Sequence, residues 1–148
     1  MKGVDYDETF APVARMESIR ILLALACHLR FKLYQMDVKT TFLNGILKED
    51  VYVAQPKRFI DPHFPDYVLY LKKAFYGLKQ APKAWYDRLT QYLVSHGFTR
   101  GKADQTLFIK KEYGKIIVAQ VYVDDIIFGS TKDELAYSSQ NSCRASSR

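Results

Sequence analysis

Two adjacent carboxylates, Asp124 and Asp125, interrupt an otherwise apolar stretch at residues 116–128. Segments this apolar are normally buried on at least one face, and a buried carboxylate is costly unless a cation or hydrogen bonds compensate it. One interpretation is therefore an acidic functional site. The alternative is an ordinary turn, because Asp is a favoured turn residue that points into solvent. The pair alone leaves both interpretations open.

A third acid, Asp37, ends a short apolar segment at residues 31–36 that is predicted to be a strand. If that strand lies beside the 116–128 segment, three carboxylates meet at one edge of a sheet. Like charges about 4 Å apart repel by roughly 4 kcal/mol at an effective dielectric of 20, and a divalent cation relieves that repulsion. Oxygen ligands select hard ions such as magnesium, and two such ions can activate a 3′-hydroxyl and stabilise a leaving pyrophosphate. The alternative for Asp37 is an exposed strand end.

The composition indicates one globular domain, because 48% of the 148 residues are hydrophobic. No apolar run approaches the roughly 18 residues of a membrane helix, so no membrane partner is expected. The charged residues 1–8 lack a secretory pattern, which favours an intracellular location, cytoplasmic or nuclear. A net charge of +6 is compatible with a polyanionic partner without identifying one. The two cysteines are interpreted as free thiols, and the three histidines lie too far apart for zinc.

The hydrophobic pattern predicts an α+β fold, an antiparallel sheet with helices packed on one face. A helix at residues 16–29 is apolar nearly all round, so burial between layers is expected. A second, amphipathic helix runs from Pro82 to His96 and stops at Gly97, and Trp85, Tyr86 and Tyr92 on it are assigned to the core. Strands are expected near residues 51–53, 67–71, 106–111, 115–123 and 126–128, with a turn at 40–44 and an irregular loop at 56–65.

Three ordered blocks resemble the reverse transcriptase of copia-type LTR retrotransposons. They are LYQMDVKTTFLNG at residues 33–45, YGLKQAPKAWY at 76–86 and YVDDII at 122–127. The opening DYDETFAPV at residues 5–13 is similar to the family as well, and the resemblance runs from about residue 3 to about 135. It implies a polymerase palm that takes an RNA or DNA template with primer and deoxynucleoside triphosphates.

The resemblance also gives roles to the acids. Asp37 and Asp124 match the first and second metal-binding acids, and Asp125 matches a third acid nearer the primer end. Together they imply two bound magnesium ions, with manganese as a substitute.

Other matching positions imply nucleotide binding. Phe42 is similar to the aromatic residue beneath the incoming sugar, where a flat ring excludes a 2′-hydroxyl; the alternative is a core aromatic. The main-chain amides of the turn from Val38 through Lys39 to Phe42 are expected to receive the triphosphate.

The block around residues 77–82 is similar to the loop that positions template and nucleotide. Gly77 lets backbone approach the base pair, Gln80 and Lys79 reach template or nucleotide, and Pro82 starts the following helix. Tyr122 is expected to face the primer terminus. The alternatives are an ordinary strand-to-helix turn and a strand tyrosine that only packs.

The resemblance covers a segment of the family's polymerase. Residues 1–135 correspond to the end of the fingers and the palm, so the remaining fingers, the thumb and a ribonuclease H domain are expected to come from the rest of a Pol polyprotein. Residues 136–148 are Ser-rich, so they are expected to be disordered and to come from a frameshift or a mispredicted exon.

Two alternative functions remain on the sequence. One is a catalytically silent retrotransposon relic that at most binds nucleic acid through its basic surplus. The other is an RNA-recognition-type sheet that binds single strands, which ranks last because its Lys or Arg-Gly-aromatic run is not found.

Overall fold

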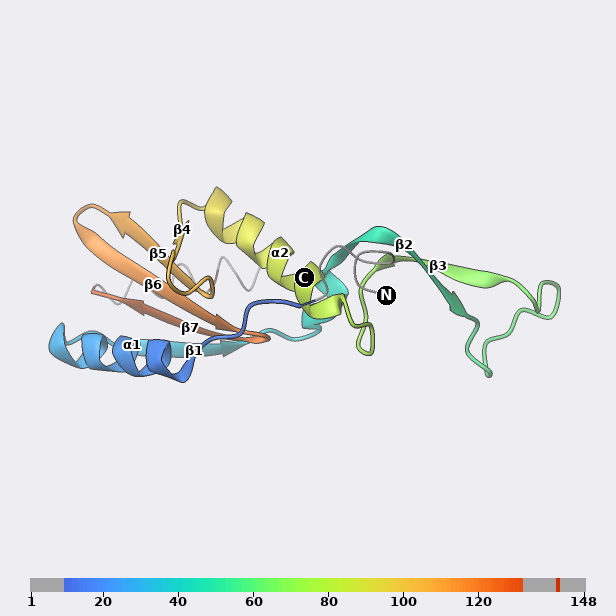
Figure 1. The fold of residues 1–148 in the computed structure, drawn as a ribbon, viewed down its shortest axis with the longest axis horizontal. Coiled ribbons are helices and arrows are strands. Elements are labelled where there is room, and N and C mark those ends of the chain that lie inside the picture. Colours follow the sequence, from blue (N-terminus) through green and yellow to red (C-terminus); the bar gives the residue numbers. More distant parts are fainter. Residues whose placement is uncertain (1–9, 132–140, 142–148) are drawn as a thin grey trace.

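The computed structural model describes residues 10–131 and 141 (Figure 1). The tail predicted to be disordered, residues 136–148, therefore lies outside the described residues except for Asn141, as does the start of the 5–13 block. The elements in chain order are α1 (Met16–His28), β1 (Leu33–Asp37), the 3₁₀ helix η1 (Thr41–Asn44), β2 (Ile46–Ala54), β3 (Val68–Lys73), α2 (Ala81–Ser95), β4 (Thr99–Arg100), β5 (Leu107–Glu112), β6 (Lys115–Tyr122) and β7 (Asp125–Ser130). Within the described residues, neither helix has the length and apolar character needed to cross a bilayer.

A five-stranded sheet forms the body of the molecule, in the order β1-β7-β6-β5-β4, and every pairing in it is antiparallel. A second sheet contains only β2 and β3, and it projects from the body as an arm (Figure 1). Two helices and antiparallel sheets confirm the predicted α+β class.

Helix α2 builds the core against one face of the large sheet. Its buried side chains include Trp85, Leu89 and Leu93, which cluster with Ala119 of β6 and Phe128 of β7. The helix follows the local signals, because Pro82 lies in its first turn and Gly97, just beyond it, has a φ of +85° that suits glycine. Both predicted ends are confirmed to within a residue or two.

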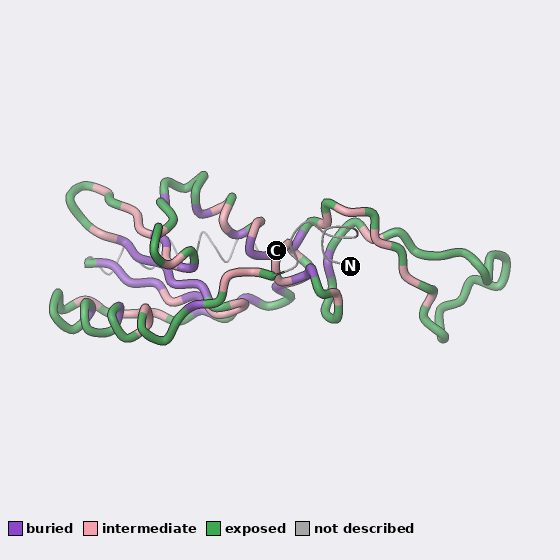
Figure 2. Tube along the Cα trace, in the orientation of Figure 1, coloured by how far each residue is buried: buried purple, intermediate pink, exposed green. Residues whose placement is uncertain are grey.

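Helix α1 forms where predicted, but the expectation that it is buried between layers is wrong. Only Leu22 and Ala26 are buried, and most of its surface is exposed (Figure 2). Ile21 and Leu23 are 67% and 55% exposed. Apolar composition shows that a helix has surface to bury, but it does not show whether the described chain supplies a second layer to cover it.

The two helices also do not share one face of the sheet. Leu22 and Ala26 are not members of the core cluster around α2. Asp104, whose pKa is lowered in part by Ser18 of α1, accepts a hydrogen bond from Gln120. Because Gln120 alternates with Ala119 along β6, its side chain belongs to the face opposite α2. The central strand β6 is buried from Ile117 to Val121, on both faces, so both faces need cover.

The β2–β3 arm confirms the strands predicted near residues 51–53 and 67–71 and the irregular loop between them. Tyr52 and Tyr70 pair across it with ring centroids 5.4 Å apart, and both are more than half exposed. The arm leaves and rejoins the body at one point, where the Ala74 amide donates to the Gly45 carbonyl at 2.9 Å.

Candidate functional site

The pairing of β1 with β7 brings the distant acidic segments together. Asp37 lies directly opposite Asp125, and one residue further the Val38 amide donates to the Asp124 carbonyl at 2.9 Å. Residues opposite each other in an antiparallel pair have Cβ atoms about 4.5–5.5 Å apart on the same face. The backbone therefore places the strand end at Asp37 next to residues 124–125, one of the arrangements that the sequence left open.

A tight turn presents the second acidic segment. Tyr122 pairs with Asp125, so Val123 and Asp124 form a two-residue turn between β6 and β7. Val123 has a φ of +53°, and Asp124 is not among the described residues with a positive φ. A positive φ at the first turn residue alone is the signature of a type II′ turn, where glycine is preferred. A β-branched residue in this region stores about 1–3 kcal/mol of strain.

The indole of Trp85 in α2 hydrogen-bonds to this turn. Its Nε1–H donates to the Val123 carbonyl oxygen at 2.8 Å, and Trp85 itself is 4% exposed. The sequence pattern predicted that Trp85 belongs to the core. The helical spacing of the apolar residues does not indicate that the indole nitrogen contacts the acidic turn.

The described side chains do not form a preassembled three-ligand site. Among the described residues, no group of three His, Cys, Asp or Glu side chains could hold a metal ion. Asp37 is exposed, whereas Asp125 is half-buried and accepts a hydrogen bond from Gln35 at 2.9 Å. Two facing carboxylates nevertheless fit magnesium, which is commonly held by one or two carboxylates together with water and substrate phosphates.

The turn after β1 carries the predicted nucleotide-binding residues. Val38 is buried, Lys39 is exposed, and Thr41 Oγ1 donates to the Val38 carbonyl. Phe42 is half-buried; it packs against the core cluster and lies 4.6 Å, centroid to centroid, from the ring of Tyr76. These contacts agree with the interpretation of Phe42 as a core aromatic residue, and its place beneath the sugar stays a prediction.

Glycine at position 45 allows η1 to approach α2 closely. A Cβ on Gly45 would lie 2.9 Å from the Trp85 amide nitrogen and 3.0 Å from the Ala84 Cβ. The turn that follows Asp37 and the helix that carries Trp85 are therefore in backbone contact. The sequence predicted only that Gly45 closes the turn, so this contact was missed.

Three of the remaining predicted residues, Gly77, Lys79 and Pro82, lie in or just after the loop before α2. Gly77 is exposed with a φ of +106°, which suits glycine, and Lys79 is exposed. Lys79 and Pro82 line a cavity of about 270 Å³ together with Trp85, Tyr86, Val121, Val123 and residues 10–13. Both residues thus lie beside the acidic turn. Tyr122 is 48% exposed and pairs with Asp125.

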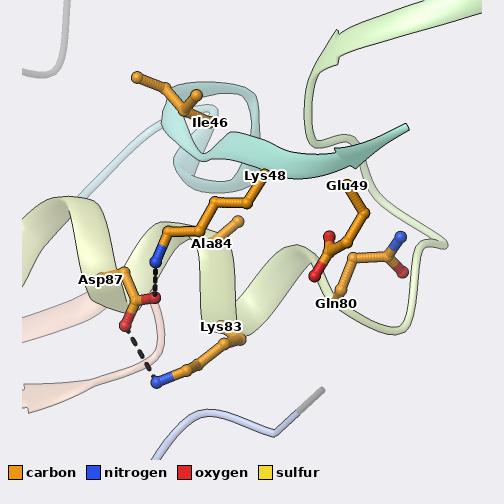
Figure 3. A pocket seen from close by; sticks show the side chains of 7 residues that line it. All are labelled: Ile46, Lys48, Glu49, Gln80, Lys83, Ala84 and Asp87. Carbon is orange, nitrogen blue, oxygen red and sulfur yellow. Dashed lines mark hydrogen bonds and ion pairs between the residues drawn. The ribbon is translucent and has the colours of Figure 1, made fainter. Parts of the chain in front are cut away.

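Gln80 lies in a different place from Lys79. Its side chain is 4% exposed, and its Nε2 lacks a hydrogen-bond partner in the described part of the chain. It lines a cleft of about 350 Å³ between β2 and α2 (Figure 3). There Asp87 pairs with Lys48 at 3.3 Å and with Lys83 at 3.0 Å. None of the three acids at positions 37, 124 and 125 lines this cleft.

Comparison with known proteins identifies relatives of most of the chain. A family model described as reverse transcriptase (RNA-dependent DNA polymerase) matches residues 1–139. The retrovirus-related Pol polyprotein from transposon RE1 of Arabidopsis thaliana is 48% identical over 125 residues, which are 84% of this chain and 8% of that protein. The corresponding polyprotein from transposon TNT 1-94 of Nicotiana tabacum is 39% identical over 137 residues, 91% of this chain and 10% of that protein.

A yeast relative is shorter. The putative transposon Ty5-1 protein of Saccharomyces cerevisiae is 37% identical over 100 residues, 68% of this chain and 32% of that protein. No solved structure matches the chain. The chain thus spans a tenth or less of the plant polyproteins it matches. Because the family model covers nearly all of it, the chain belongs to the reverse transcriptase (RNA-dependent DNA polymerase) family.

Proposed function

We propose that this chain is the palm segment of an RNA-directed DNA polymerase, which adds deoxynucleotides to a primer paired with an RNA or DNA template. The observation that carries the proposal is the register of β1 with β7, which sets Asp37 opposite Asp125 and ties Val38 to Asp124. Within this function Asp37 and Asp124 hold two magnesium ions, or manganese in their place, and Asp125 lies nearer the primer end.

Asp37 and Asp124 would hold these ions, which would supply Lewis acidity toward the primer 3′-hydroxyl and the pyrophosphate leaving group. The chain's own residues position the substrates. The backbone of Val38 and Lys39 receives the triphosphate, Phe42 lies beneath the sugar, and Gly77 leaves room for the nascent base pair. Gln80, being buried, acts by supporting this loop rather than by direct contact.

The surface beside the acidic turn, formed by Tyr122, Lys79 and Pro82, fits the primer and template. Tyr122 is exposed next to Asp125, and Lys79 and Pro82 border the cavity under Val123. An exposed lysine there can pair with a phosphate, which adds a salt-dependent contribution to nucleic-acid affinity. The fingers, thumb and ribonuclease H parts come from the remainder of the polyprotein, since the plant relatives are at least ten times as long as the matched region.

Primer extension on a homopolymer RNA template with magnesium tests the proposal. The chain alone, without fingers and thumb, is expected to be weak or inactive. With those parts of the polyprotein supplied, we expect deoxynucleotide incorporation by the wild type, its loss in Asp124→Asn, and its retention in Asp66→Asn, an exposed acid in the arm. Incorporation that survives Asp124→Asn would overturn the assignment of the acids.

A silent relic with non-specific nucleic-acid binding is the second candidate. The net charge of +6 and the missing three-ligand cluster in the described residues favour it. It is supported if the wild type incorporates nothing but still binds RNA and DNA of unrelated sequence with an affinity that falls steeply with salt.

A further inference from the structure

The acidic turn holds a conformation that its own sequence disfavours. Val123 has a φ of +53° immediately before Asp124, and a β-branched side chain is strained there. Strained backbone persists only where the surrounding structure over-determines it. The contacts that reach Val123 from outside the hairpin therefore decide where Asp124 sits.

Trp85 makes such a contact. Its Nε1–H donates to the Val123 carbonyl at 2.8 Å from within the core, where the indole is 4% exposed. Because Trp85 is a buried residue, few groups of the core compete with the Val123 carbonyl for its N–H. The bond fixes the peptide that joins Val123 to Asp124.

The same residue also touches the turn that follows Asp37. The backbone of Trp85 lies 2.9 Å from the position of a Cβ on Gly45, so η1 rests directly on this turn of α2. Trp85 therefore contacts the segment that follows Asp37 through its backbone and the acidic turn through its side chain.

We propose that Trp85 is a positioning residue, whose indole N–H holds the Val123–Asp124 turn against the Asp37 side of the site. A role for this hydrogen bond in catalysis rests on the proposed function, but its role in fixing the turn does not. The competing explanation is that Trp85 only fills core volume. The explanations differ in whether the N–H matters. Phenylalanine has no N–H to donate and keeps an aromatic ring in the core, although a smaller one, so exchange of the indole N–H in the wild type is followed as well.

The matched variants are Trp85→Phe and Tyr86→Phe. Tyr86 is the next residue of α2, is equally buried, and donates its hydroxyl to the Gln105 carbonyl at 2.6 Å, on a different loop. Each variant removes one hydrogen bond from a buried aromatic residue. Only the first removes a bond to the acidic turn.

Amide hydrogen exchange by NMR measures the hold on the turn without any requirement for catalysis. The reporter is the Val38 amide, which donates to the Asp124 carbonyl, and the reference is the Val121 amide, which donates to the Thr106 carbonyl beside Gln105. We expect Trp85→Phe to speed exchange at Val38 about three- to ten-fold, the loss of one hydrogen bond, while Tyr86→Phe leaves Val38 unchanged. Rates are compared after both variants are shown to keep the slowest core amides protected.

Equal exchange at Val38 in the wild type and in Trp85→Phe overturns the proposal. So does rapid exchange of the indole N–H in the wild type, where the single tryptophan gives a single indole signal. Faster exchange at Val38 in both variants also overturns it, because that result indicates general loosening of α2.

Binding of Mn²⁺, followed by electron paramagnetic resonance, connects the turn to the proposed function. We expect Trp85→Phe to weaken Mn²⁺ binding about three- to ten-fold and Tyr86→Phe to leave it unchanged. A wild type that binds no Mn²⁺ contradicts the proposed function, while the exchange experiment still decides whether Trp85 holds the turn.

Discussion

Asp37 lies directly opposite Asp125 in the antiparallel pairing of β1 with β7. Like charges in this position destabilise a sheet, so the arrangement works against folding unless something cationic meets it. We therefore predict that Asp37→Asn raises stability by about 0.5 kcal/mol when divalent ions are absent. Thermal unfolding in a chelating buffer checks this, with Asp66→Asn, which lies outside any strand, as the control.

Magnesium should shrink the difference between wild type and Asp37→Asn, because bound cation screens the pair that the substitution relieves. A gain in stability that is equal with and without magnesium would show that the carboxylates do not share an ion.

Gly45→Ala should disturb the contact between η1 and α2. The new Cβ would lie 2.9 Å from the Trp85 amide nitrogen, which is backbone and cannot rotate away, so we expect a loss of about 1–3 kcal/mol. Chemical denaturation measures the loss, and the tryptophan fluorescence should change because Trp85 is displaced.

Gly114→Ala is the matched control. Gly114 has a φ of +72° and open space around it, so alanine there costs about 1–2 kcal/mol through backbone strain alone. Its Trp85 fluorescence should match the wild type. A Gly45→Ala protein with unchanged fluorescence would contradict the proposed contact.

Two neighbouring leucines of α1 should respond in opposite ways. Leu22 is 4% exposed and Leu23 is 55% exposed. We expect Leu22→Ala to cost about 2–4 kcal/mol by leaving a cavity, and Leu23→Ala to change stability by less than about 0.5 kcal/mol. Urea unfolding of both variants measures this, and similar costs would show that α1 is covered on both sides.

Acid should unfold the protein partly through Asp104. Burial raises the pKa of this carboxyl, but hydrogen bonds from Ser18, Thr106 and Gln120 outweigh the burial and hold the pKa below its usual value. A lowered folded-state pKa contributes stability above the ordinary carboxyl pKa of about 3.9, and that contribution is lost as the pH falls further through the folded-state value.

Asp104→Asn should therefore be less stable than the wild type near neutral pH and should lose less stability between about pH 4 and pH 2. Urea unfolding across that range checks this, again with Asp66→Asn as the control. Parallel pH profiles for Asp104→Asn and the wild type would contradict the role given to the hydrogen bonds.

Local signals in the sequence account for most of the elements. Pro82 and Gly97 mark the ends of α2, and Gly114 marks the turn between β5 and β6, because these residues have backbone preferences that act at their own positions. The pairing of β1 with β7 had no such local signal, because the sequence offered it only as a condition under which three acids would meet at one edge of a sheet. Its register confirms that Asp37 and the 124–125 pair are neighbours.

The features that the sequence could not predict depend on contacts between distant segments. The bond from Trp85 to Val123 joins a helix to a hairpin turn 38 residues further along. The approach of Gly45 to α2 likewise joins two segments that are distant in the sequence. The burial of Gln80 and the exposure of α1 depend in the same way on which surface meets which neighbour. Periodicity describes one element at a time, so it is silent on these contacts.

The base of the β2–β3 arm has a consequence for how the protein can be altered. The chain enters the arm at Gly45 and returns at Ala74, and one hydrogen bond joins these two residues. The strands of residues 46–73 are not interleaved with the five-stranded sheet, although the start of β2 contacts α2 through the ion pair of Lys48 with Asp87. Because the far loop at residues 55–67 lies beyond both strands of the arm, we expect shortening it there to leave the order of the main strands and the acidic turn unchanged.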